Sequence, residues 1–97
     1  MKKTYFTLVG TDYRFGSGFL KPGMKLYLRK EPDNTYDSEA IRVTLPGLGT
    51  IGYVGNSINT VIGDSSSAGR LGCKIGKKAK ARVKYITKKG ILCVLTK

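Results

Sequence analysis

The sequence predicts a small domain that is mostly β, with one or two short helices. Short apolar stretches follow the two-residue alternation of half-buried strands, and turn residues separate them. Glycine is frequent, at 13 of 97 residues, whereas proline occurs 3 times, and this composition favours short strands and turns over long helices. A chain of this length buries one modest core, so we expect residues 1–97 to form a single domain.

Four strands are predicted in the first half of the chain, at residues 3–10, 26–29, 40–45 and 50–54. The second shows the period clearly, because Leu26 and Leu28 alternate with Tyr27 and Arg29. The connection to the third strand begins with Pro32, whose φ is fixed, followed by Asp and Asn, whose side chains hydrogen-bond to their own backbone. We therefore expect an ordered turn between these two strands.

A helix, a loop and a closing hairpin are predicted in the second half. Asn56 is expected to cap a short helix, because the apolar residues at positions 58, 61 and 62 have helical spacing. Residues 63–69 are rich in Ser and Gly and are expected to end that helix in a surface loop. Strands at 79–85 and 91–95, joined by a Lys-Lys-Gly turn, form the hairpin.

The formal charge is +12, from 18 Lys and Arg against 6 Asp and Glu. Ten of the basic residues and no acidic one lie in residues 70–97. Lys80, Arg82 and Lys84 alternate with small or apolar residues, so they form a row of cations on one strand face. A charge this large has to be solvated or matched by an anionic partner, and we favour a polyanion over a merely solvated face.

Several function classes have little support. The chain contains no histidine, which removes imidazole bases, Ser-His and Cys-His pairs and His-based metal sites. Cys73 and Cys93 are too few for a tetrahedral zinc site, and we expect reduced thiols, with Cys93 in the core. No apolar stretch approaches the roughly 18 residues of a membrane span. We expect a cytoplasmic protein without catalytic residues, metal or cofactor.

Nucleic-acid binding is favoured by the charge, by the basic strand face and by aromatic residues on loops. Bases stack on tyrosine or phenylalanine whatever their identity, and Lys and Arg add a salt-sensitive attraction to the phosphates. The alternatives are an RNA-binding module that uses the same face and an adaptor whose charge meets an acidic protein. These features together are typical of a protein that binds single strands.

The chain resembles a known family between about residues 8 and 61. The pattern Arg-x-Glu-Pro-Asp-Asn-x-Tyr-Asp-x-x-Ala-Ile-x-Val, followed by Ile-Gly-Tyr-Val, is similar to the signature of the HIRAN domain. The resemblance implies a small β-barrel of about six strands, like an oligonucleotide-binding fold, that recognises free 3′ ends of single-stranded DNA in repair or replication-fork processing. Because no helicase motifs are present, we expect a stand-alone domain whose partner is a separately encoded helicase or nuclease.

The resemblance also implies roles for individual residues. Those that would contact the nucleic acid are Tyr13, Arg14, Asn34, Tyr36, Asp37 and Tyr53. In this interpretation Tyr13 and Tyr36 flank the terminal nucleotide, Arg14 holds the backbone, Tyr53 contacts a phosphate, and Asp37 accepts a hydrogen bond from the 3′-hydroxyl. A carboxylate in that position would repel a 3′-phosphate and so detect free ends.

Structural roles for the same residues stay open at this point. Tyr36 and Tyr53 are also compatible with packing in the domain, and Asp37 with capping a turn or pairing with Arg42. The sequence departs from the family pattern at Thr35, where a proline is usual, which loosens the loop. A late aromatic that closes the family's pocket has no clear counterpart here, and Tyr85 is the nearest candidate.

Overall fold

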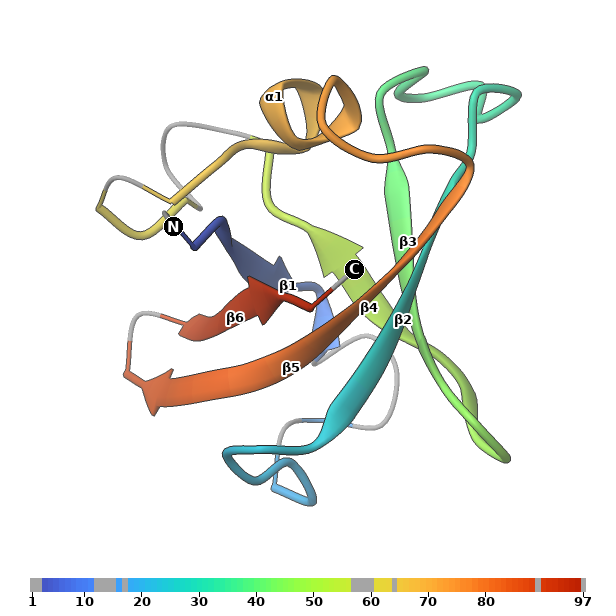
Figure 1. Cartoon of the computed structure of the whole chain (residues 1–97). Helices are drawn as coiled ribbons and strands as arrows, with labels where there is room; N and C mark the ends of the chain where they lie inside the picture. Colours follow the sequence, from blue (N-terminus) through green and yellow to red (C-terminus); the bar gives the residue numbers. More distant parts are fainter. Residues whose placement is uncertain are drawn as a thin grey trace.

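The computed structural model describes residues 3–11, 16, 18–56, 61–63, 65–88 and 90–96. Within this part of the chain, six antiparallel strands close into a barrel in the order β1-β4-β3-β2-β5-β6 (Figure 1). The elements are β1 (Tyr5–Val9), β2 (Lys25–Lys30), β3 (Ile41–Leu45), β4 (Gly49–Val54), α1 (Ala68–Gly72), β5 (Lys78–Thr87) and β6 (Gly90–Leu95). The predicted mostly β, OB-like barrel is confirmed.

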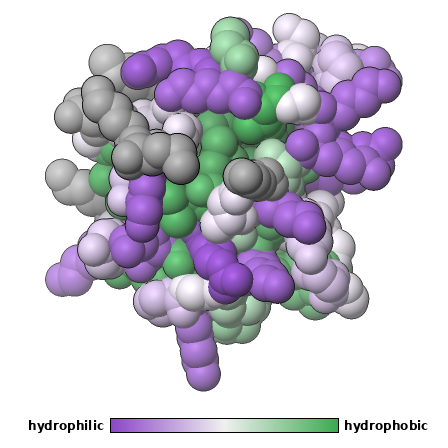
Figure 2. Space-filling model, in the orientation of Figure 1, coloured by the Kyte–Doolittle hydropathy of each residue, from purple (hydrophilic) through white to green (hydrophobic). Residues whose placement is uncertain are grey.

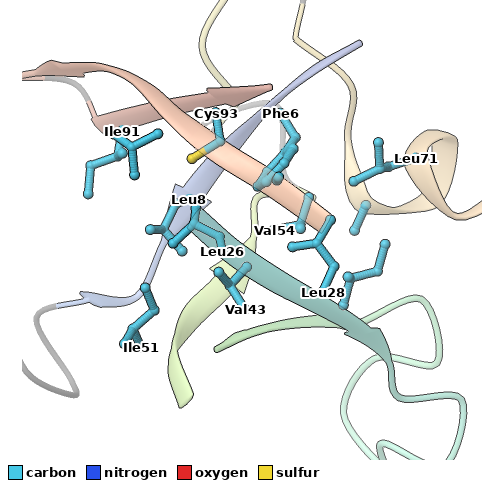
Figure 3. Packing of buried hydrophobic residues seen from close by; sticks show 14 of the residues in the cluster. Phe6, Leu8, Leu26, Leu28, Val43, Ile51, Val54, Leu71, Ile91 and Cys93 are labelled. Carbon is cyan, nitrogen blue, oxygen red and sulfur yellow. The ribbon is translucent and has the colours of Figure 1, made fainter. Parts of the chain in front are cut away.

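The barrel interior is filled by the apolar residues of the predicted alternation. On β2, Leu26 and Leu28 are buried, whereas Tyr27 between them is only half-buried. Equivalent alternate residues from the other strands point into the same space (Figure 3). The largest contributors are Phe6, Leu8, Leu26, Leu28, Ile41, Val43, Ile51, Leu71 and Cys93. Burial raises the pKa of the Cys93 thiol to about 12, so this residue acts as a small apolar core residue.

Two strands hold the barrel together across long sequence separations. β1 pairs with β4 on one side and with β6 on the other. β5 is the longest strand and changes partner along its length, pairing with β2 from residue 78 to residue 82 and with β6 from residue 81 to residue 87. The outer face of β5 therefore runs from the end of the barrel near the β2–β3 loop to the opposite end (Figure 1).

The predicted helix after Asn56 is wrong at Val61 and Ile62, which are not helical, while residues 57–60 lie outside the described part of the chain. The helix α1 lies instead further along, partly within the segment predicted to be a surface loop. That segment is held by β1, because the hydroxyls of Thr7 and Ser65 are 2.9 Å apart and both residues are buried. Tertiary contacts to β1 thus override the local preference of a Ser-Gly run for solvent.

Ser67 begins α1 as its N-cap and accepts a hydrogen bond from the backbone N–H of Arg70. Ala68 and Leu71 of this helix are buried in the barrel core, so α1 closes one end of the barrel (Figure 1). Among the described residues, no helix has the length and apolarity needed to cross a membrane.

Candidate nucleic-acid interface

The outer face of the sheet carries two neighbouring rows of polar side chains. Cross-strand pairing places Tyr53 of β4 beside Arg42 of β3, Arg42 beside Arg29 of β2, and Arg29 beside Lys78 of β5. These residues alternate with buried ones, so the row points outward. Paired residues on one face lie within side-chain reach of each other.

The second row lies two residues further along the strands. Tyr27 of β2 pairs with Thr44 of β3 on one side and with Lys80 of β5 on the other. Residues of both rows line a shallow depression of about 410 Å³. A tyrosine ring between a hydroxyl and an ammonium offers a stacking surface beside a phosphate contact.

A larger depression, of about 840 Å³, lies next to the first and has the β2–β3 loop as its wall. The two depressions share Arg29 and Arg42, and we call them together the basic groove. Its charged lining consists of six cations and two carboxylates, namely Arg29, Lys30, Arg42, Lys77, Lys78, Lys80, Glu31 and Asp33. The groove therefore attracts anions.

Glu31 does not oppose this attraction, because its charge is matched inside the groove. The Glu31 carboxylate forms an ion pair with Arg42. Burial acts to raise the pKa of Glu31, but hydrogen bonds from Asn34 and Tyr53 and the positive charge of Arg42 outweigh it, so the pKa lies below its ordinary value of 4.5. No carboxylate of the described residues pairs with Arg29, which leaves its guanidinium available to a phosphate.

The lowered pKa of Glu31 predicts a pH dependence of stability. Glu31 stabilises the fold above its unfolded pKa of about 4.5, and this contribution is lost as the pH falls through the lower pKa of the folded state. We expect Glu31→Gln to show a smaller loss of unfolding free energy on acidification than the wild type, measured by urea unfolding at several pH values. Parallel losses in the two proteins would contradict the role assigned to this carboxylate.

The β2–β3 loop is ordered by its own side chains. The Asn34 Oδ1 atom accepts hydrogen bonds from the backbone N–H groups of Tyr36 and Asp37, at 2.9 and 3.1 Å. The Asp37 Oδ1 atom accepts one from the N–H of Glu39 at 2.9 Å, and Asp37 Oδ2 accepts one from the Asn56 amide at 3.3 Å. This ordered loop holds Tyr36 in the wall of the groove with 98% of its surface exposed.

Comparison with known families identifies the family of the protein that carries this groove. The family model described as HIRAN domain matches residues 1–94. The chain belongs to the HIRAN domain family. HIRAN domains bind DNA, which agrees with the charge and shape of the groove. No curated protein and no solved structure matches this chain.

This HIRAN domain brings several of the residues predicted from the sequence together. Asn34, Tyr36 and Tyr53 all line the basic groove. Asp37 is not among the lining residues, and both of its oxygens are engaged within the loop and with Asn56. The predictions for Tyr13 and Arg14 fall on residues 12–15, which lie outside the described residues. Tyr85, the nearest candidate for the family's pocket-closing aromatic, does not line the groove.

The cations predicted on β5 are divided between two places. Lys80 lines the basic groove beside Tyr27. Arg82 and Lys84 line a separate depression of about 520 Å³ between β5 and the end of β6, together with Lys3. The row predicted from the sequence therefore lines two concave surfaces, and the register of β5 against β6 is irregular between Val83 and Tyr85.

The groove of this HIRAN domain also contains residues that were not predicted from the sequence to bind nucleic acid. They are Tyr27, Arg29 and Arg42 on the outer face and Lys30 at the end of β2, whereas Lys77 and Lys78 belong to the basic segment for which a polyanion was predicted. The alternation in residues 26–29 already placed Tyr27 and Arg29 opposite the buried leucines, so the signal for these two was present. Lys78 joins them only through the pairing of β5 with β2, which local patterns do not reveal.

Among the residues that the structure describes, no group of three or more Cys, Asp and Glu side chains is arranged to hold a metal ion. The candidate site consists of cations, aromatic rings and an ordered loop.

Proposed function

We propose that this HIRAN domain is a binding module, without catalysis, that takes single-stranded DNA into the basic groove with a free 3′-hydroxyl end at the β2–β3 loop. The observation that carries the proposal is the position of Tyr36, which an ordered loop holds almost fully exposed in the wall of a cationic groove. An exposed aromatic side chain in this position loses little conformational entropy on folding. Stacking on a base would contribute favourable binding free energy.

The groove supplies the two kinds of contact that a single strand needs. Arg29, Lys78 and Lys80 lie on adjacent strands and offer charge to successive phosphates without reading sequence. Tyr36 and Tyr27 offer rings to bases, which a single strand exposes and a duplex does not. Free 3′ ends arise in repair and at replication forks, so the proposal includes a role in that processing.

End recognition is assigned to the carboxylates of the loop. Each Asp37 oxygen accepts one hydrogen bond from the described residues and has a second lone pair for a terminal hydroxyl. A 3′-phosphate at the same position would bring negative charge against Asp37 and be rejected. Two loop carboxylates line the groove; Glu31 is paired with Arg42, so Asp33 is the comparison for this assignment.

The test uses matched DNA and RNA strands of about ten nucleotides with 3′-hydroxyl or 3′-phosphate ends, followed by fluorescence anisotropy. We expect the hydroxyl-ended DNA to bind most tightly. Arg29→Gln is expected to weaken all strands alike and to reduce the slope of log affinity against log salt by about 0.7, the value for one phosphate contact.

Asp37→Asn keeps an oxygen for the Glu39 N–H and removes the charge, so it should abolish the preference for the hydroxyl end with little loss of affinity. Equal affinity of the wild type for both ends would remove end recognition from the proposal. Loss of the preference in Asp33→Asn instead would move the role to Asp33. Unchanged binding in Arg29→Gln would overturn the groove as the binding site, and tighter binding of RNA would overturn DNA as the ligand.

A further inference from the structure

The β5–β6 depression, lined by Lys3, Arg82 and Lys84 among its nine residues, is a second concave basic surface beside the groove. It follows directly on the rows of the groove. Lys25 of β2 pairs with Arg82 of β5, two residues beyond the pair of Tyr27 and Lys80. Two residues of a strand span about 7 Å, so the Lys25 and Arg82 pair is the next step along the same outer face.

No carboxylate of the described residues forms an ion pair with the cations of this surface. The four carboxylates in the described part of the chain all lie in residues 31–39, at the β2–β3 loop. Among the residues that the structure describes, no acidic one lines the depression. The Arg82 guanidinium is held in place by a 2.8 Å hydrogen bond from Nη1 to the carbonyl oxygen of Gly23, and Arg82 itself is exposed. A positioned guanidinium with free donors is a ready contact for a phosphate.

The depression also offers apolar and aromatic surface. The half-buried side chains of Val94 and Leu95 contribute to its lining beside the cations. The neighbouring Tyr85 is 57% exposed, and the Lys84 ammonium lies over its ring at 5.6 Å from the centroid. On the face of the molecule that carries β2 and β5 in front, apolar surface shows between projecting hydrophilic side chains (Figure 2). Unstacked bases use such surface, whereas a duplex keeps its bases inside.

We infer that the β5–β6 depression binds the continuation of the single strand whose 3′ end lies in the groove. The strand leaves the groove over Lys80, passes the Lys25 and Arg82 pair, and places nucleotides on the 5′ side at Lys84 and Tyr85. The inference rests on the proposed function and adds a longer footprint to it. The groove selects the end, and the depression adds affinity that depends on strand length.

The test compares three DNA ligands by fluorescence anisotropy: a strand of about four nucleotides, a strand of about twelve, and the short strand as the 3′ overhang of a duplex. We expect the long strand to bind roughly tenfold more tightly than the short one, the gain of about one stacked base. The double variant Arg82→Gln, Lys84→Gln is expected to lose this gain while binding the short strand like the wild type. The variant Lys3→Gln, Lys84→Gln leaves the Arg82 bond intact and should lose part of the gain.

The matched control is Arg70→Gln, Lys74→Gln, which removes the same charges from two exposed residues that line neither surface. It should keep the full dependence on strand length. If this control loses as much of the affinity gained with strand length as the Arg82→Gln, Lys84→Gln variant does, net charge alone is responsible and the inference is overturned. Equal affinity for the short and long strands would also overturn it. So would a higher affinity than that of the short strand shown only by the ligand that carries the duplex. Failure of the short strand to bind at all would instead overturn the proposed function.

Discussion

Replacing Tyr36 by alanine is expected to weaken binding of single-stranded DNA by roughly 5- to 150-fold, the equivalent of about 1–3 kcal/mol for one stacked base. The ring is 98% exposed and packs against no core residue, so its removal should change the free energy of unfolding by less than about 0.5 kcal/mol. Anisotropy with a labelled strand and thermal unfolding of the same sample measure the two quantities.

Two further variants sharpen the result for Tyr36. Tyr36→Phe keeps the ring and removes the hydroxyl, so it should retain most of the affinity if stacking is the main contact. Leu48→Ala removes another exposed apolar side chain, on the turn between β3 and β4, and should leave binding unchanged because Leu48 does not line the groove. If Tyr36→Ala binds like the wild type, or Leu48→Ala loses as much affinity, Tyr36 is not a stacking residue.

The loop that carries Tyr36 shows how far local sequence determines the site. Thr35, in place of the family's usual proline, predicted a looser loop. The structure has an ordered loop. The Asn34 side chain accepts hydrogen bonds from the backbone N–H groups of Tyr36 and Asp37, and the Asp37 side chain accepts one from Glu39. Side-chain acceptors thus supply the order that a fixed φ would have given. The predicted turn between the second and third strands is confirmed for this reason.

The strands could be predicted because successive side chains of a strand point to opposite faces of the sheet. The face that carries the apolar residues is the one that points into the barrel. The helix could not be predicted, since α1 depends on contacts of Ser65 and Ser66 with β1, about sixty residues earlier. The groove was predictable only in part. Its loop residues are near neighbours in sequence, but Lys78 reaches Arg29 through a strand pairing that spans half of the chain.

The largest effect on stability is expected for Gly52→Ala, in the Ile-Gly-Tyr-Val run of β4. A Cβ atom on Gly52 would lie 2.5 Å from the backbone oxygen of Val9 and 2.8 Å from Leu8 Cδ1. The backbone oxygen cannot withdraw without disturbing the pairing of β1 with β4, which includes the pair of Val9 and Tyr53. We expect a loss of about 1–3 kcal/mol, as for other insertions into a packed core, and a fall in Tm of roughly 4–8 °C per kcal/mol.

Gly76→Ala is the matched control for this prediction. Nothing lies within 4 Å of a Cβ atom at Gly76, and its φ is not positive, so the change should stay within about 0.5 kcal/mol. Thermal unfolding of both variants separates close approach of strands from the general effect of replacing a glycine. If Gly52→Ala has the same Tm as the wild type, β1 and β4 do not approach each other closely at Gly52. If Gly76→Ala unfolds at the wild-type temperature and Gly52→Ala unfolds at a lower one, Gly52 is required for the close approach of β1 and β4. Its neighbour Tyr53 lines the basic groove.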